Sequence, residues 1–142
     1  MNTSSNNKVY KFAKRGIVRV EYVDNLFRFY GHKPDKEPID VAAKDMIDLC
    51  SYSLTAKEKY DRAQADLAQN PHKETKELAS FLISKEGKYE TRLEVSTWDG
   101  KVWMWLKMLA CDGPKRSYLP GIVAWSDLDA QMLKEFYFKC IS

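Results

Sequence analysis

The chain has 142 residues, of which 44% are hydrophobic and 30% are charged, with 23 basic and 20 acidic side chains. This length fits one domain with its own core, and the composition excludes a wholly disordered chain. The longest apolar run, Val102–Leu106, is far shorter than the ~20 residues of a membrane-spanning helix, and residues 1–7 contain no apolar segment that could act as a secretion signal. Three widely spaced cysteines, Cys50, Cys111 and Cys140, indicate free thiols in a reducing compartment. We therefore expect a cytoplasmic protein that makes no membrane contact.

Residues 1–7 predict a flexible polar tail, and residues 8–142 predict a single domain. The first clear pattern is an alternation of apolar and polar residues over about 17–30, centred on Asp24-Asn25. Such Asx residues tolerate the left-handed conformations of a tight two-residue turn. The pattern therefore predicts a hairpin in which Glu21 lies opposite Arg28.

Residues 39–69 contain neither glycine nor proline and favour helix. A capping-box sequence at 55–58 predicts a break that divides this segment into two helices. A third helix is expected over 70–87, because Asn70-Pro71 is typical of a helix start. The polar stretch 55–77 is expected to project from the core as a helical arm.

The strongest local signal is a second pair of alternating runs over 89–110, joined by the favoured hairpin dipeptide Asp99-Gly100. A last helix is expected to start at Ser126–Asp129, although 136–140 also fits a strand. The order of elements predicts an α+β fold. Its mainly antiparallel sheet is built from the two hairpins (about 17–30 and 89–110), with a helical insertion between them and a C-terminal helix.

One face of the second hairpin carries tryptophans that alternate with charged residues. Exposed aromatic surface beside arginine is typical of protein interfaces and of surfaces that stack on bases. The alternative is that a helix covers this face and the rings belong to an ordinary core. The candidate partner-binding residues are Trp98, Trp103, Trp105, Arg92, Glu94 and Lys107.

The first 33 residues are basic, with seven basic and two acidic side chains. A basic two-stranded ribbon can neutralise phosphates and enter a major groove. Lysines on an edge strand also serve simply to prevent edge-to-edge pairing. The candidate nucleic-acid-binding residues are Lys8, Lys11, Lys14, Arg15, Arg19 and Tyr30.

Signals for an enzyme are weak, and the sequence implies no metal and no cofactor. The two histidines, His32 and His72, do not lie at metal-ligand spacing from cysteines or carboxylates. A nucleophile pair of Cys111 with either histidine remains an alternative. The triplets 86–88 and 99–101 each place an acid two residues before a lysine, which resembles half of a metal-dependent nuclease site.

These patterns favour a non-enzymatic binding protein whose partner is another protein, reached through the tryptophan-bearing face, the helical arm or both. An adaptor or inhibitor, such as an accessory protein of a virus or mobile element, fits this size. The first alternative is a nucleic-acid-binding protein that uses the basic ribbon and tryptophan stacking. The second is an enzyme, nuclease-like or cysteine-dependent, whose site is unrecognised.

Overall fold

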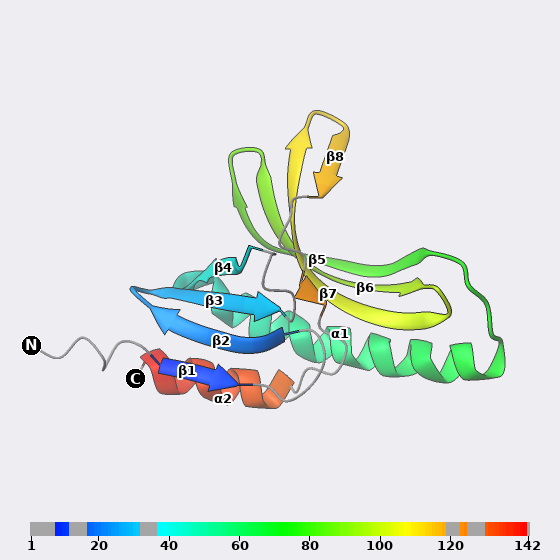
Figure 1. The fold of residues 1–142 in the computed structure, drawn as a ribbon, viewed down its shortest axis with the longest axis horizontal. Helices are drawn as coiled ribbons and strands as arrows, with labels where there is room; N and C mark the ends of the chain where they lie inside the picture. Colours follow the sequence, from blue (N-terminus) through cyan, green and yellow to red (C-terminus); the bar gives the residue numbers. More distant parts are fainter. Residues whose placement is uncertain (1–7, 12–16, 32–36, 119–122, 125–129, 142) are drawn as a thin grey trace, which may run out of the picture.

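The computed structural model describes residues 8–11, 17–31, 37–118, 123–124 and 130–141 (Figure 1). In chain order, the elements of this part of the chain are β1 (Lys8–Lys11), β2 (Ile17–Val23), β3 (Leu26–Gly31), β4 (Ile39–Ala42), α1 (Ala43–Gln69), β5 (Lys76–Glu86), β6 (Tyr89–Trp98), β7 (Lys101–Asp112), β8 (Lys115–Tyr118), β9 (Val123–Ala124) and α2 (Ala130–Ile141). All strand pairs are antiparallel, which confirms the predicted α+β class. The tail predicted over 1–7 and the start expected for the last helix lie outside the described residues.

The strands form two sheets rather than the single sheet that we expected. Sheet A has the order β1-β2-β3-β4, and sheet B has the order β5-β6-β7-β8, with β9 pairing with β7. The first predicted hairpin is β2-β3, and Asp24 and Asn25 both adopt positive φ in its turn. Glu21 lies opposite Arg28 as predicted, but the Arg28 guanidinium forms its ion pair with Asp40 of β4, at 2.8 and 3.0 Å.

The predicted break in the central helix is wrong. α1 is one continuous helix of 27 residues, because its buried positions recur every three or four residues straight through the capping-box sequence. This buried stripe consists of Met46, Leu49, Cys50, Ser53, Ala56, Tyr60 and Leu67. α1 begins against sheet A and continues along sheet B (Figure 1), so the two sheets share one helix.

The third helix expected over 70–87 is also wrong, because most of this segment is β5. The arm predicted over 55–77 is therefore helical only as far as Gln69, and its helical part packs on sheet B through Ala56, Tyr60 and Leu67. Among the described residues, no helix combines the length and the apolar composition needed to cross a membrane.

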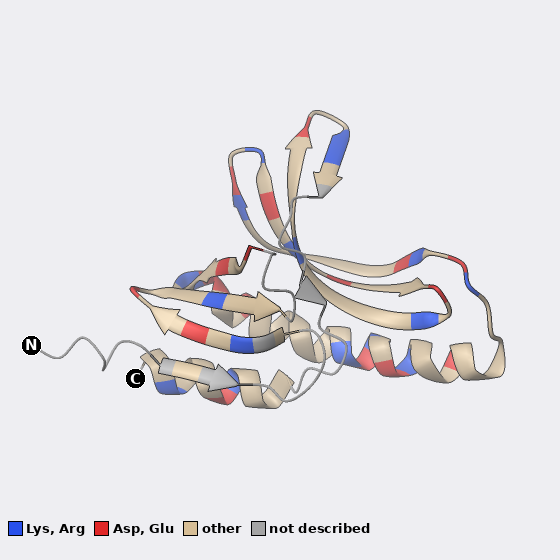
Figure 2. Cartoon of the chain, viewed as in Figure 1, with Lys and Arg blue, Asp and Glu red and all other residues tan. Residues whose placement is uncertain are grey.

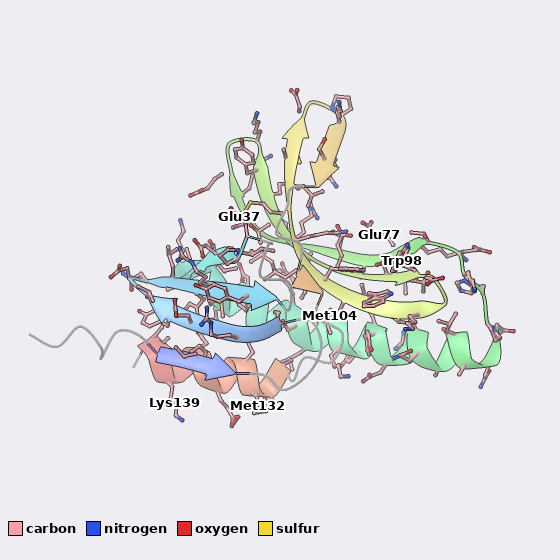
Figure 3. All side chains as sticks on the ribbon, viewed as in Figure 1. Glu37, Glu77, Trp98, Met104, Met132 and Lys139 are labelled. Atoms are coloured by element: carbon pink, nitrogen blue, oxygen red, sulfur yellow. The ribbon has the colours of Figure 1, made fainter. Side chains whose placement is uncertain are left out.

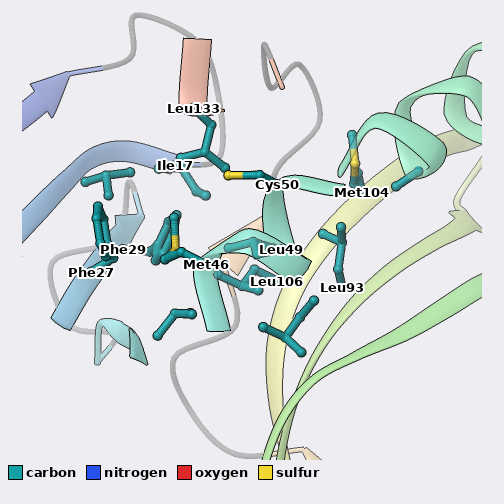
Figure 4. Close-up of a cluster of buried hydrophobic side chains, with 14 of the residues drawn as sticks. Ile17, Phe27, Phe29, Met46, Leu49, Cys50, Leu93, Met104, Leu106 and Leu133 are labelled. Carbon is teal, nitrogen blue, oxygen red and sulfur yellow. The ribbon is translucent and has the colours of Figure 1, made fainter. Parts of the chain in front are cut away.

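A single buried cluster joins both sheets and both helices (Figure 4). Phe27 of β3 lies 6.0 Å from Phe136 and 5.8 Å from Tyr137, measured between ring centroids, and these contacts place α2 on sheet A. Leu93 and Met104 of sheet B are completely buried in the same cluster. α2 also settles the alternative for residues 136–140, which are helical.

Candidate functional site

The register of β6 and β7 brings the six candidate partner-binding residues onto one face of sheet B. Three directly opposed pairs are Ser96–Trp103, Glu94–Trp105 and Arg92–Lys107. Alternate residues of a strand share a face, so Trp98 lies on this face as well. α1 packs against the opposite face, where Leu93, Val95, Met104 and Leu106 join the core. We call the surface with the three tryptophans the tryptophan face.

The three indole rings are in mutual contact. Trp103 and Trp105 stack with centroids 5.2 Å apart at an interplanar angle of 28°, and Trp98 lies 6.0 Å from Trp103 at 58°. The Trp98 side chain is 51% exposed, and the other two are half-buried. Figure 3 shows Trp98 at the same end of sheet B as Glu77 of β5.

Hydrogen bonds within the sheet already use two of the indole N–H groups. Trp105 Nε1 donates to Ser96 Oγ at 2.8 Å, and Trp103 Nε1 donates to the Trp98 carbonyl oxygen at 3.1 Å. What these two rings offer a partner is therefore apolar ring surface held in a fixed orientation.

The charged residues beside the tryptophans form a buried network. Lys107 Nζ lies 2.6 Å from Glu94 Oε1, and Arg92 Nε lies 2.8 Å from Glu90 Oε1. Ser80 of β5 links the two pairs, because its hydroxyl accepts from Arg92 Nη1 at 3.1 Å and donates to Glu94 Oε2 at 3.3 Å. The hydrogen bond from Arg92 lowers the pKa of Glu90 below its usual value and keeps this carboxylate ionised.

This network changes the role of the charges that we selected from the sequence. Arg92, Glu94 and Lys107 do lie beside the tryptophans, but they pair with neighbouring side chains on the same sheet rather than standing free. We infer that they fix the platform on which the rings sit. Alternation along the strand places Glu90 on the same face as Glu94, but we assigned it no role from the sequence, and Ser80 fell in a segment that we expected to be helical.

The four candidate nucleic-acid-binding residues that the structure describes lie on sheet A, away from the tryptophan face. Lys8 and Lys11 belong to the edge strand β1, where Lys11 is opposite Arg19 of β2. The Arg19 guanidinium lies 3.9 Å above the Tyr30 ring centroid, so this ring already has a cationic partner within the protein. The other two members, Lys14 and Arg15, lie outside the described residues.

Of the residues considered for catalysis, the structure describes the two triplets, Cys111 and His72. The triplets 86–88 and 99–101 lie at opposite ends of β6. His72 Nδ1 accepts a hydrogen bond from the Glu74 backbone N–H at 3.1 Å, and His32 lies outside the described residues. In the described part of the chain, no three His, Cys, Asp or Glu side chains are grouped to hold a metal.

A cavity of about 450 Å³ lies between the second half of α1 and the start of β5. Residues of the predicted arm line it, including Arg62, Leu67 and His72, together with Thr97 next to Trp98. The helical part of the arm thus forms one wall of this cavity.

Cys50, Cys111 and Cys140 form no disulfide, and burial raises the pKa of the Cys50 thiol to about 11. Such a thiol is protonated at neutral pH and is a poor nucleophile. Comparison with known proteins adds no function, because no protein-family model matches this sequence and no curated protein matches it significantly.

Proposed function

We propose that this chain is a binding protein, an adaptor or inhibitor, that docks another protein through the tryptophan face. The observation that carries this proposal is the half-exposed Trp98 ring, which continues the stacked pair Trp103–Trp105 at the end of sheet B. Burial of such a ring against a partner removes apolar surface from water and is therefore favourable. Large aromatic side chains that are held rigidly at a surface are typical anchors of protein interfaces.

The charges support a protein partner over a nucleic acid. The two cations beside the rings, Arg92 and Lys107, are each paired with a glutamate of the same face, and Arg116 on the edge strand β8 lies 3.5 Å from Glu90. A surface that binds phosphates needs uncompensated positive charge. An apolar partner surface with few charges of its own fits this face better.

Alanine at Trp98 tests the proposal. Because the ring is half exposed, Trp98→Ala is expected to weaken capture of the partner from a lysate of the native host at least tenfold while changing the melting temperature little. Tyr89→Ala is the matched control, since Tyr89 lies on the same strand, is 44% exposed and points to the opposite face. Equal capture by wild type and Trp98→Ala, or equal loss with Tyr89→Ala, would contradict the proposal.

The same capture experiment distinguishes binding of a protein from the alternative, binding of a nucleic acid. Pairing of Lys11 with Arg19 supports a basic ribbon at the edge of sheet A. Binding through that ribbon would disappear after nuclease treatment and would weaken steeply with salt, whereas capture through Trp98 would survive both. The absence of a disulfide among Cys50, Cys111 and Cys140 supports a reducing compartment such as the cytoplasm as the place where the protein acts.

A further inference from the structure

Strand β5 forms one edge of sheet B and is unusually long for an edge. It has 11 residues and hydrogen-bonds to β6 on one side, and none of the described strands pairs with its other side. Leu78 and Leu82 of this strand are 40% and 41% exposed. An open edge of this kind is a ready template for another strand.

The charges of β5 are arranged symmetrically about its central residue, Phe81. The strand begins with Lys76-Glu77, ends with Lys85-Glu86 and carries no charge in between, as Figure 2 shows. If a second copy of β5 pairs antiparallel about Phe81, Lys76 lies opposite Glu86 and Glu77 lies opposite Lys85. Opposite charges directly across a strand pair stabilise it, and like charges destabilise it.

The charges also select one register. A shift of one residue in one direction places Lys76 opposite Lys85, and a shift in the other direction places Glu77 opposite Glu86. Only the register centred on Phe81 forms four opposite-charge pairs, two of each kind, in a symmetric dimer.

The backbone irregularities of β5 follow the same symmetry. Its register with β6 shifts at Leu78 and again at Ile83, so that 78–79 and 83–84 each place two neighbouring residues on one face. A two-fold axis through Phe81 exchanges 78–79 with 83–84. Each bulge of one copy therefore meets a bulge of the other, and every side chain keeps a cross-strand neighbour on its own face.

We propose that β5 pairs antiparallel with β5 of a second copy of this chain, about a two-fold axis at Phe81, and joins the two B sheets into one continuous sheet. Phe81 is already held at this position, because its ring stacks on Tyr52 of α1 with centroids 4.9 Å apart at 20°. The contact is isologous, so it closes after two copies and does not propagate into a fibre. This assembly is independent of the proposed function, since it uses the open edge of sheet B and not the three tryptophan rings.

A charge-swap series measured by analytical ultracentrifugation tests the assembly. Wild type is expected to show a monomer–dimer equilibrium. Glu77→Lys and Lys85→Glu each replace two attractive pairs by two repulsive ones and should each raise the dissociation constant about tenfold or more. The double variant restores opposite charges and should return the constant close to that of wild type.

Lys101→Glu is the matched control for Lys85→Glu, because it replaces a lysine by a glutamate at an exposed position outside β5. It should leave the dissociation constant unchanged. A wild-type protein that stays monomeric up to its highest soluble concentration would overturn the proposal. So would a double variant as weak as the singles, or an equal effect of Lys101→Glu.

A disulfide series tests the register directly. Glu77 and Lys85 are eight residues apart on β5, roughly 25 Å at about 3.3 Å per residue, so cysteines at both positions cannot bond within one chain. Glu77→Cys combined with Lys85→Cys should give a covalent dimer on a non-reducing gel, whereas either single variant should not. Dimer bands of equal strength from the single variants, the absence of a dimer, or cross-links only to a different protein would each overturn the assignment.

Discussion

Glu94 and Lys107 are an ion pair with almost no access to water. Their side chains are 3% and 10% exposed, and Ser80 donates a further hydrogen bond to Glu94. Removing two charges from water costs several kcal/mol for each ion, and their mutual attraction offsets this cost only while both are present. The pair therefore contributes a fixed geometry to the tryptophan face more than it contributes net stability.

Replacement of one partner should expose this dependence. Lys107→Met leaves an uncompensated buried carboxylate, and we expect it to lower the free energy of unfolding by about 3–5 kcal/mol in urea denaturation. Glu94→Leu in the same chain should recover most of this loss.

Lys57→Met provides the exposed control. Lys57 pairs with Asp61 on the surface of α1, where the two side chains are 38% and 61% exposed. Its replacement should cost less than about 1 kcal/mol. A loss of similar size in Lys107→Met and Lys57→Met would show that the Glu94 pair is not effectively buried.

The alternation of residues along β6 and β7 was sufficient to predict which six side chains share the tryptophan face. It could not predict that Arg92 pairs with Glu90 and Lys107 with Glu94 in one network. The hydroxyl that links the two pairs belongs to Ser80, in a strand that the sequence led us to expect as a helix. The sequence likewise could not show which of Trp98, Trp103 and Trp105 is most exposed, since this depends on the hydrogen bonds and packing of each ring.

At the scale of elements, the hairpins were predictable and β5 was not. Tight turns have local requirements, and Asp24-Asn25 and Asp99-Gly100 meet them. In β5, the irregularities at 78–79 and 83–84 interrupt the alternation and place apolar residues at spacings that resemble a helix. Asn70-Pro71 just before it strengthened the wrong interpretation.

The continuity of α1 also shows a local sequence signal that the tertiary structure overrides. Thr55–Glu58 matches a capping box, but a cap acts only where the helix ends, and Ala56 and Tyr60 extend the buried stripe across this point. Packing against sheet B therefore outweighs the local signal.

The turn between β6 and β7 depends on glycine for its conformation and not for space. Gly100 has φ +77°, and an added Cβ would meet Lys73 Cγ at 3.8 Å and the His72 carbonyl oxygen at 3.9 Å, which are ordinary contacts. We expect Gly100→Ala to lower the free energy of unfolding by about 1 kcal/mol through backbone strain alone. Gly100→Asn should cost less, because asparagine adopts positive φ more readily. Thermal melts that rank Ala above Asn in stability would contradict this account.

Over the whole molecule, α1 links two sheets that have no described strand pair in common. Met46 lies beside Phe27 and Phe29 of sheet A, and Leu49 lies beside Leu106 of sheet B (Figure 4). The shared core predicts that the two sheets unfold together, as expected for a small single domain.

Leu49→Ala tests whether the two sheets unfold cooperatively, because Leu49 is completely buried on α1. We expect a loss of about 2–5 kcal/mol in the free energy of unfolding, from lost burial and the cavity left behind. Hydrogen–deuterium exchange should show equal loss of protection in 17–31 and 89–110. Loss confined to one of these segments would show that the sheets unfold separately.

Alternation along a strand has a last consequence for the paired molecule. A two-fold axis perpendicular to a sheet leaves its faces unexchanged, so the dimer through β5 displays both indole clusters on the same side. A partner with repeated or symmetric epitopes would bind both clusters at once. When one site dissociates, the other keeps the partner bound, so the released site rebinds at high effective concentration. Modest single-site affinity would then become strong avidity without any new contact.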